Sequence, residues 1–503
     1  MSGQPGSDLL ARLERLPLSR PHLTLLAMGG LGLTFDGLDV ATVAFVLPSV
    51  TEEWQLSSGQ TGLVGSSTLI GFFFGALGAG IIADRIGRRR VMMWALAVFC
   101  LATLVAAVSP SWEFFFLARL VAGIGTGAES AIIPAFLSEF VPGRLRGRFI
   151  GALAGFFSFG YVGAALLARW IVPMGPEGWR VLHVVATVPI VLLLWWRRSV
   201  PESPRFLLAR GRTDEARAVI ETIERQAARS AATRPPSPAA PSPTVTPANP
   251  APGTAPPPRV GIGGLWRRDL AGRTAVLWVL WVVITFSFYG FFTFIPTLLY
   301  ADGLTIAKSF TYSIVIYLAQ IPGYYSAAAL NDLLDRKWTI ALYLGGGSVA
   351  AYLLSGSDIS AQVMIFGGLL SFFMNGVYAA IYAYTPELYP TAVRARGMGT
   401  ASAVGRIGGI SAPILIGTTY PVIGFDGVFL VTTGVLAVGV VVVLAFGVST
   451  SGRALEEISD SGSATVPAPD GPAPVVPGNR TVTGARGPVA VGREGRSPRV
   501  DPS

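Results

Sequence analysis

The sequence predicts an all-α membrane protein whose twelve transmembrane helices form two pseudo-symmetric six-helix bundles. Of the 503 residues, 51% are hydrophobic and only 13% are charged, which leaves too little charge to cover the surface of a soluble protein. Runs of about 20 apolar residues, enough to span the hydrocarbon layer, are centred near residues 35, 72, 100, 126, 159, 188, 286, 320, 347, 373, 408 and 435. Each run must be helical, because a lipid-exposed strand edge would leave backbone groups unpaired.

The second half of the chain repeats the first at a constant offset of 248 residues. The turn G-I-I-A-D-R-I-G-R-R-R at 80–90 returns as A-L-N-D-L-L-D-R-K, so that Asp84 matches Asp332 and Arg88 matches Arg336. The same offset, without a gap, joins Pro48 to Pro296, Glu139 to Glu387, Pro142 to Pro390, Arg146 to Arg394 and Arg148 to Arg396. Two parallel halves of this kind leave a site at the midplane of the membrane and rock about it. The repeat therefore predicts a secondary transporter that works by alternating access.

The distribution of positive charge predicts the orientation in the membrane. With the N-terminus inside, the short inner loops hold eleven Lys and Arg residues and the short outer loops hold three. This bias predicts a multi-pass protein of the cell membrane with both termini in the cytoplasm. It also assigns the net charge of +9 to lipid headgroups rather than to nucleic acid. We expect a cytoplasmic segment at 1–21, bundles at 22–196 and 273–448, a cytoplasmic loop at 197–272 and a cytoplasmic tail at 449–503.

The loop between the bundles divides into two parts of different composition. Phe206, Ala216, Val219, Ile220 and Ile223 recur at helical spacing and predict a short amphipathic helix under the membrane. Residues 235–258 contain eleven prolines and predict a disordered linker. The tail after about residue 460 is expected to be disordered as well.

The basic turn after the second span and the ends of spans 4 and 10 are expected to form the inner gate. The turn resembles the G-x-x-x-D-R-x-G-R-R signature of the major facilitator superfamily, in which it acts as a conformational latch. The ends of spans 4 and 10 read S-E-F-V-P-G-R-L-R-G-R and P-E-L-Y-P-T-A-V-R-A-R. We expect Glu139 to pair with Arg146 or Arg148, and Glu387 to pair with Arg394 or Arg396. The gating candidates are Asp84, Arg88, Glu139, Arg146, Glu387 and Arg394.

Five charged side chains inside the apolar runs indicate function, because such charges are costly in a membrane and usually mark a transport pathway. Asp36 and Asp39 lie on one face of the first span, and Glu129 lies in the fourth. We expect these three carboxylates to couple transport to protons. Arg119, in the fourth span, and Arg406, in the eleventh, are candidates for binding a substrate anion. The alternative is a structural ion pair, such as Asp39 with Arg119 or Arg406 with an aspartate of the first span.

Several segments resemble the sugar-porter branch of the superfamily, among them P-E-S-P-R-F-L after the sixth span and G-R-A-L-E-E-I after the twelfth. The seventh span reads F-S-F-Y-G-F-F-T-F-I-P and lacks the paired glutamines of hexose porters. The motif F-D-x-x-D in the first span is similar to one in aromatic-acid/proton symporters and bacterial niacin-type transporters. Segments such as A-Q-I-P-G-Y-Y-S-A-A and G-R-I-G-G-I-S-A-P resemble the niacin type more closely.

The niacin-type resemblance implies a small heteroaromatic monocarboxylate such as nicotinate as substrate. An arginine suits its carboxylate, and aromatic side chains suit its ring, although Phe and Tyr also pack helix interfaces generally. The expected substrate-binding residues are Arg119, Arg406, Asn375, Gln320, Tyr289 and Tyr382.

Other functions fit the sequence less well. It contains no metal-ligand cluster, phosphate-binding loop or nucleophile triad, so we expect neither an enzyme nor a cofactor. A non-transporting sensor would typically lose the intramembrane charges. A proton-coupled exporter remains an alternative, but the fifth span lacks the G-P pair of drug/proton antiporters, which favours import. Transport of another metabolite or a sugar is the other alternative. The expected partners are the substrate, protons and the lipid bilayer, with a monomer as the functional unit.

Overall fold

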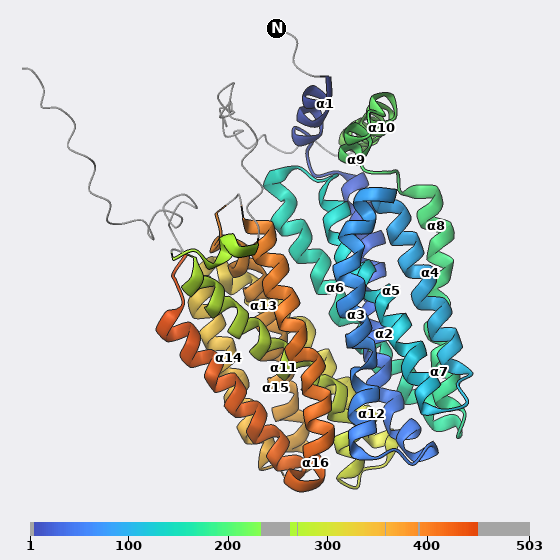
Figure 1. The fold of residues 1–503 in the computed structure, drawn as a ribbon, viewed down its shortest axis with the longest axis vertical. Helices are drawn as coiled ribbons and strands as arrows, with labels where there is room; N and C mark the ends of the chain where they lie inside the picture. Colours follow the sequence, from blue (N-terminus) through green and yellow to red (C-terminus); the bar gives the residue numbers. More distant parts are fainter. Residues whose placement is uncertain (1–4, 233–261, 269, 358, 391–392, 451–503) are drawn as a thin grey trace, which may run out of the picture. The chain divides into compact units, whose positions relative to one another are not determined.

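The computed structural model describes residues 5–232, 262–268, 270–357, 359–390 and 393–450, and these residues form helices, turns and loops without a strand. Nine helices in this part of the chain are long and apolar enough to cross a membrane. One of them, α16, contains two spans joined at Gly424, whose φ of +64° interrupts the helix. Two further spans are built from shorter pieces. The described residues thus confirm twelve membrane crossings (Figure 1).

The first six crossings come from the N-terminal half of the chain. They are α2 (Arg20–Glu53), α3 (Ser58–Ile86), α4 (Arg88–Ala107), α5 (Trp112–Ser138), α6 (Gly143–Ile171) and the series α7 (Gly178–Ala186), η2 (Val188–Val191) and α8 (Leu192–Ser199), with η1 (Val172–Met174) after α6. Polar side chains fix several helix starts. Ser57 accepts a hydrogen bond from the backbone of Gln60 at the start of α3, and Ser111 accepts one from Phe114 at the start of α5.

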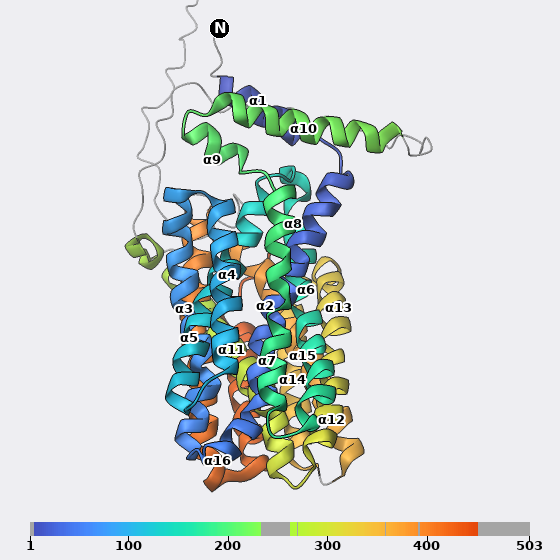
Figure 2. The same cartoon turned by 90° about the vertical axis from the view of Figure 1, so that its right-hand side faces the viewer.

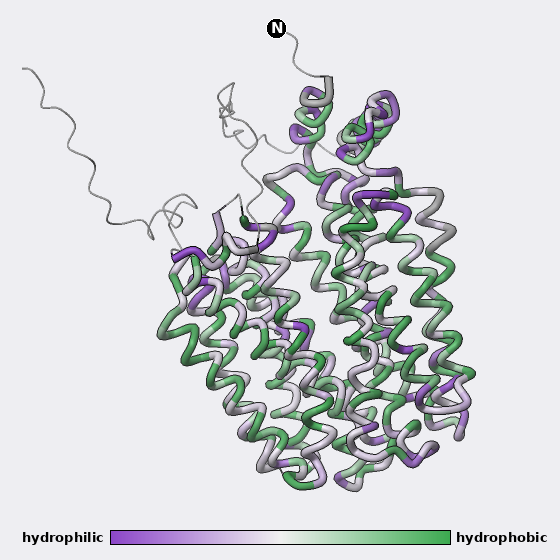
Figure 3. Tube along the Cα trace, viewed as in Figure 1, coloured by the Kyte–Doolittle hydropathy of each residue, from purple (hydrophilic) through white to green (hydrophobic). Residues whose placement is uncertain are grey.

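The second six crossings follow the same order. They are α11 (Ala271–Ala301), the pair α12 (Ile306–Leu318) and α13 (Gln320–Leu333), α14 (Arg336–Ser355), α15 (Ser360–Glu387) and the two legs of α16 (Arg394–Phe446), with η3 (Ile262–Trp266) before α11. The eighth crossing is broken at Ala319, between α12 and α13. Hydrophobic residues follow the length of these helices, whereas hydrophilic residues gather near the helix ends (Figure 3).

Three short helices lie across one end of the N-terminal bundle: α1 (Pro5–Glu14), α9 (Pro204–Ala209) and α10 (Thr213–Ala232) (Figure 2). We call this end the inner face, because the charge bias predicts that it faces the cytoplasm. Arg12 forms an ion pair with Glu224 that joins α1 to α10. The single amphipathic helix expected here is divided into two, with Phe206 on α9 and the other four residues on α10. Ala216, Ile220 and Ile223 of α10 are buried, and Val219 is half-buried. The proline-rich stretch at 235–258 and the tail after 460 lie outside the described residues.

Hydrogen bonds join the two bundles near the outer end and the middle of the membrane. Ser66 of α3 donates to the carbonyl oxygen of Ile410 (2.9 Å), and Arg169 of α6 donates to Thr311 (2.8 Å). Near the middle, Asn375 of α15 donates to Ser158 of α6 (2.7 Å).

Two glycines allow α3 and α16 to approach closely at the outer end. A methyl group at Gly417 would lie 2.8 Å from both Cα of Gly62 and the carbonyl oxygen of Ser58. A methyl group at Gly62 would lie 2.8 Å from the carbonyl oxygen of Pro413. Small residues permit such backbone contact between membrane helices. The outward-open state that the repeat predicts would have to break this contact.

We expect Gly417→Leu to separate the outer ends and shift the protein toward the outward-open state. The measurement is labelling of Ser66→Cys by a membrane-impermeant maleimide added from outside, since Ser66 is fully buried in this contact and the native Cys100 is buried elsewhere. Labelling should increase several-fold in the double variant. Gly59→Leu is the matched control, because a methyl group there would meet only a side-chain atom of Thr418, at 3.8 Å. Equal labelling in both backgrounds would show that the glycine contact does not control the outer opening.

Candidate functional site

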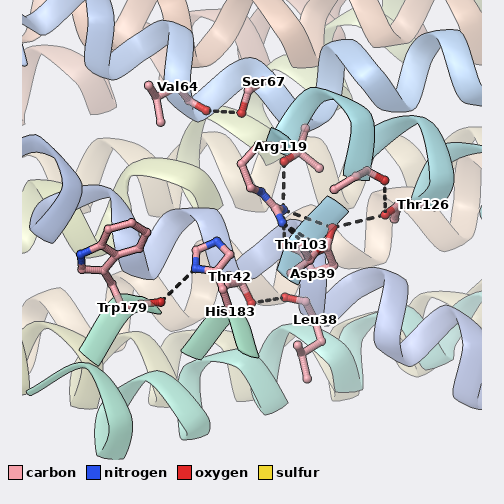
Figure 4. Close-up of polar contacts among 12 residues, drawn as sticks. Leu38, Asp39, Thr42, Val64, Ser67, Thr103, Arg119, Thr126, Trp179 and His183 are labelled. Atoms are coloured by element: carbon pink, nitrogen blue, oxygen red, sulfur yellow. Dashed lines mark hydrogen bonds and ion pairs between the residues drawn. The ribbon is translucent and has the colours of Figure 1, made fainter. Parts of the chain in front are cut away.

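Asp39 and Arg119 form a completely buried ion pair between α2 and α5 (Figure 4). The guanidinium donates to both carboxylate oxygens, with Nη1–Oδ1 at 2.8 Å and Nη2–Oδ2 at 3.1 Å, and also to the backbone oxygen of Asp39. Thr103 and Thr126 donate to the carboxylate, and Thr68 accepts from the guanidinium. Every member is at most 1% exposed. This geometry matches the structural ion pair that the sequence left open as the alternative to a transport role.

Asp36 and Glu129, in contrast, have no basic partner among the described residues. Ser130 donates to Oδ2 of Asp36 at 2.7 Å. The other oxygen of Asp36 and both oxygens of Glu129 have no hydrogen-bond partner within the part of the chain that the structure describes. Both residues are 0% exposed. An unpaired ionised carboxylate is very costly in a low-dielectric interior, so such groups normally hold a proton. This pair is therefore suited to proton exchange.

Arg406 projects from α16 between the two bundles. Its Nη1 donates to the hydroxyl of Tyr289 on α11 at 2.8 Å. Its guanidinium carbon lies 4.1 Å from the centroid of the Phe72 ring, on α3 of the other bundle. No carboxylate of the described residues forms an ion pair with it, so it does not pair with an aspartate of the first span. Among the described residues, this half-buried cation contacts a phenol hydroxyl and the faces of two aromatic rings, an arrangement suited to receive an anion.

The other expected substrate-binding residues lie on the helices around Arg406. The ring of Tyr382 packs edge-on against Trp281 at 5.1 Å. Asn375 donates to Ser158 and to the backbone oxygen of Gln320 (2.8 Å), so it links the bundles and satisfies a carbonyl next to the break in the eighth crossing. The amide of Gln320 is 1% exposed, and neither of its polar atoms has a partner among the described residues. The sequence did not indicate Tyr378, whose buried hydroxyl is also unpartnered there.

The inner gate is paired differently from the sequence-based expectation. Glu139 pairs with Arg88 (2.9 Å) rather than with Arg146, and Glu387 pairs with Arg336 (3.0 Å) rather than with Arg394. Arg88 and Arg336 are equivalent in the repeat, and so are the two glutamates. The physical reason is that both arginines have other partners. Arg146 pairs with Glu14 of α1 (3.2 Å) and donates to the carbonyl oxygens of Ser138 and Val141. Arg394 donates to the carbonyl oxygen of Tyr389. Asp84 lies 3.3 Å from Arg88 and is largely exposed.

In both halves a carboxylate lies at the same point of the inner face, but a different segment supplies it in each half. In the first half, Gly87 (φ +102°) ends α3, and a methyl group there would lie 2.5 Å from the carboxylate of Glu202. In the second half the equivalent residue is Asp335 (φ +94°), whose carboxylate accepts from the backbone and hydroxyl of Thr450 (3.3 and 3.2 Å) and from Ser449. At the offset of 248, Thr450 matches Glu202. The carboxylate thus follows the last span in the first half, as Glu202, whereas in the second half it lies in the turn between α13 and α14, as Asp335.

Replacing Asp335 by glycine should weaken the contact between this turn and Thr450. Adding Thr450→Glu should restore it, because the carboxylate then comes from position 450, as it comes from Glu202 in the first half. Partial burial by itself raises the pKa of Asp335, but the hydrogen bonds from Ser449 and Thr450 outweigh this and hold the pKa below its ordinary value of 3.8. The contribution to stability is therefore complete above pH 3.8 and is lost only as the pH falls through the lower folded value.

The measurement is the apparent unfolding temperature in detergent at neutral pH. We expect Asp335→Gly to lower it by a few degrees, since about 1 kcal/mol corresponds to about 2–4 °C for domains of 150–250 residues. Glycine adopts a positive φ more easily than aspartate, so a loss would report the carboxylate rather than backbone strain. A double variant no more stable than Asp335→Gly would contradict the exchange of partners.

Twelve crossings in two related halves, with buried charges near the middle of the membrane, define a membrane transporter of the major facilitator superfamily. The chain belongs to the family described as "Sugar (and other) transporter", whose model matches residues 26–461. It is 37% identical over 454 residues to the niacin transporter NiaP of Acinetobacter baylyi, covering 90% of this chain and 99% of that protein. It is 32% identical to a putative niacin/nicotinamide transporter NiaP of Bacillus subtilis, covering 88% of this chain and 100% of that protein.

The fold is similar to that of the xylose transporter XylE from E. coli in a partially occluded inward-open conformation. The TM-score is 0.67 at 17% sequence identity, with 87% of this chain and 100% of that chain covered. At this identity the likeness shows the fold alone. The family and fold together show a transporter and not an enzyme.

Proposed function

We propose that the protein is a proton-coupled importer of a small heteroaromatic monocarboxylate, such as nicotinate, that works by alternating access in the cell membrane. The observation that carries this proposal is the environment of Arg406. It is a guanidinium between the bundles, without a carboxylate partner among the described residues and in contact with Tyr289 and Phe72. An anionic aromatic molecule supplies both the missing charge and a ring that can pack on these side chains. The names of the two niacin transporters that resemble the chain support the same class of substrate.

The residues expected to bind substrate take different parts in this proposal. Arg406 and Tyr289 bind the carboxylate, and Tyr382 packs on the ring. Gln320 offers a donor and an acceptor next to the helix break, where its amide is otherwise unpartnered. Asn375 shapes the middle of the site through its bonds to Ser158 and Gln320. Arg119 acts on the substrate site only indirectly, through Asp39, since its guanidinium already donates to both oxygens of that carboxylate.

Proton coupling is assigned to the carboxyl groups of the first and fourth spans. Asp36 and Glu129 are the proton-exchanging pair, because they are buried without a cation in the described structure. Asp39 is expected to participate only if its ion pair with Arg119 opens during the cycle. The gate residues Asp84, Arg88, Glu139, Arg146, Glu387 and Arg394 are proposed to hold the inner ends of the helices and to rearrange as the bundles rock.

The test is uptake of labelled nicotinate, benzoate and glucose by cells that lack their own carriers for these compounds and express this protein. The cytoplasmic location of both termini is tested separately. We expect accumulation of nicotinate that rises with an inward proton gradient and collapses when a protonophore is added. Benzoate, which lacks the ring nitrogen, should be a weaker substrate, and glucose should not be taken up. Uptake of glucose alone would overturn the proposal, and export of preloaded nicotinate under the same gradient would identify an exporter.

A further inference from the structure

We propose that the hydroxyl of Tyr378 is a binding group for the substrate carboxylate, beside Arg406 and Tyr289. This inference deepens the proposed function and rests on its anionic substrate. Tyr378 lies on α15, three residues after Asn375 and four before Tyr382, so that the three side chains share one side of the helix.

The hydroxyl of Tyr378 is buried and has no hydrogen-bond partner among the described residues. Leaving a buried hydroxyl unpartnered is costly, and buried tyrosines usually satisfy this group. The ring itself is well packed: it lies edge-on to Phe288 at 4.9 Å and to Trp281 at 6.4 Å, and it stacks with Tyr382 at 6.2 Å. The packing of the ring therefore holds the hydroxyl in one place, where no described residue offers it a hydrogen-bond partner.

The position of Tyr378 relative to Arg406 indicates which partner this is. Phe288 contacts both Tyr378 (4.9 Å) and Tyr289 (5.2 Å), and Tyr289 accepts the hydrogen bond from Arg406. Because the oxygen of Tyr289 accepts from Arg406, its proton is free to be donated.

A carboxylate placed here would receive hydrogen bonds from one guanidinium and two phenols. It would neutralise Arg406 and satisfy Tyr378 at the same time. A ligand without a negative charge would leave the guanidinium uncompensated. The arrangement thus selects for anions by the number of donors as well as by charge.

The experiment measures equilibrium binding of nicotinate, benzoate and nicotinamide to the purified full-length protein in detergent. Tyr378→Phe removes only the hydroxyl and keeps the packed ring. We expect affinity for nicotinate and benzoate to fall by about ten-fold, the usual scale for a hydrogen bond to a charged group. Binding of nicotinamide should change little. Tyr343→Phe is the matched control, since it also removes only a tyrosine hydroxyl, but one on α14 that already contacts the hydroxyl of Ser326 (2.7 Å) and that the proposal gives no part in binding.

The outcomes separate this inference from the proposed function. If the unchanged protein binds neither acid, the anionic substrate itself is wrong. If it binds both acids and Tyr378→Phe binds them equally well, only the role of Tyr378 is wrong. A loss confined to nicotinate would assign the hydroxyl to the ring nitrogen and overturn the carboxylate assignment. Equal losses in Tyr378→Phe and Tyr343→Phe would also overturn it.

Discussion

Replacing Asp36 by asparagine is expected to abolish nicotinate accumulation driven by a proton gradient while leaving downhill exchange intact. The side chain keeps its shape and can still bond to Ser130, but it can no longer take up and release a proton. Because Asp36 has no cation partner in the described structure, its neutral form leaves no charge unpaired, and the protein should fold and insert normally. Glu129→Gln should behave in the same way, since its carboxyl group has the same kind of surroundings.

The measurement compares accumulation under an inward proton gradient with counterflow in proteoliposomes at equal pH on both sides. Counterflow needs binding and rocking but no net proton movement, so it should survive in Asp36→Asn and in Glu129→Gln. Gradient-driven accumulation should fall to simple equilibration. Undiminished accumulation in both variants would remove this pair from the coupling mechanism.

Asp39→Asn provides a contrast because it breaks a buried ion pair. It leaves Arg119 fully buried with its positive charge uncompensated, a change that typically costs about 3–5 kcal/mol. We expect little folded protein in the membrane from this variant. The double change Asp39→Asn and Arg119→Gln removes both charges and should recover much of the folded protein. If Asp39→Asn instead folds normally and loses only gradient-driven accumulation, Asp39 belongs to the proton pathway.

The sequence was sufficient to predict the fold because apolar length, charge bias and an ungapped repeat all depend on local residue identity. It could not distinguish Asp36 from Asp39. The two lie three residues apart on one helix face, and only the packing of α5 decides that Arg119 reaches the second. For the same reason the gate glutamates were wrongly predicted to pair with arginines in their own sequence segments. The contact between Arg88 and Glu139 spans two helices, and nothing in a single sequence shows their relative rotation.

Other features left no distinctive signal in the sequence. Tyr378 was missed because a tyrosine in a membrane helix is ordinary, and only the absence of a partner for its hydroxyl in the described structure makes it a candidate. The break at Ala319 contains neither glycine nor proline, although Pro322 follows closely. The positive φ of Asp335 occurs at one of the few non-glycine residue types that adopt it with some frequency, but an aspartate alone does not predict it. Only the match to Gly87 in the first half of the repeat indicates it.

Arg406→Lys is expected to weaken binding and uptake of nicotinate strongly and to affect nicotinamide much less. Lysine keeps the positive charge but loses the planar pair of donors, one of which now contacts Tyr289. It also loses the flat face that lies over the ring of Phe72. We expect affinity for the acid to fall by about ten-fold or more, which corresponds to about 1.4 kcal/mol. The amide has no charge to be held, so the same change should cost it little.

Arg336→Lys is the matched control, because Arg336 is an arginine of the inner gate that pairs with Glu387. That change should alter the rate of transport without separating acid from amide. The measurement is equilibrium binding of both ligands to each variant, followed by initial rates of uptake. Selective loss of the acid in Arg406→Lys alone would place the carboxylate on Arg406. Equal losses of acid and amide would instead show that the guanidinium supports the packing of α16 against α3 and α11. The proposal of an anionic substrate would then lose its main support.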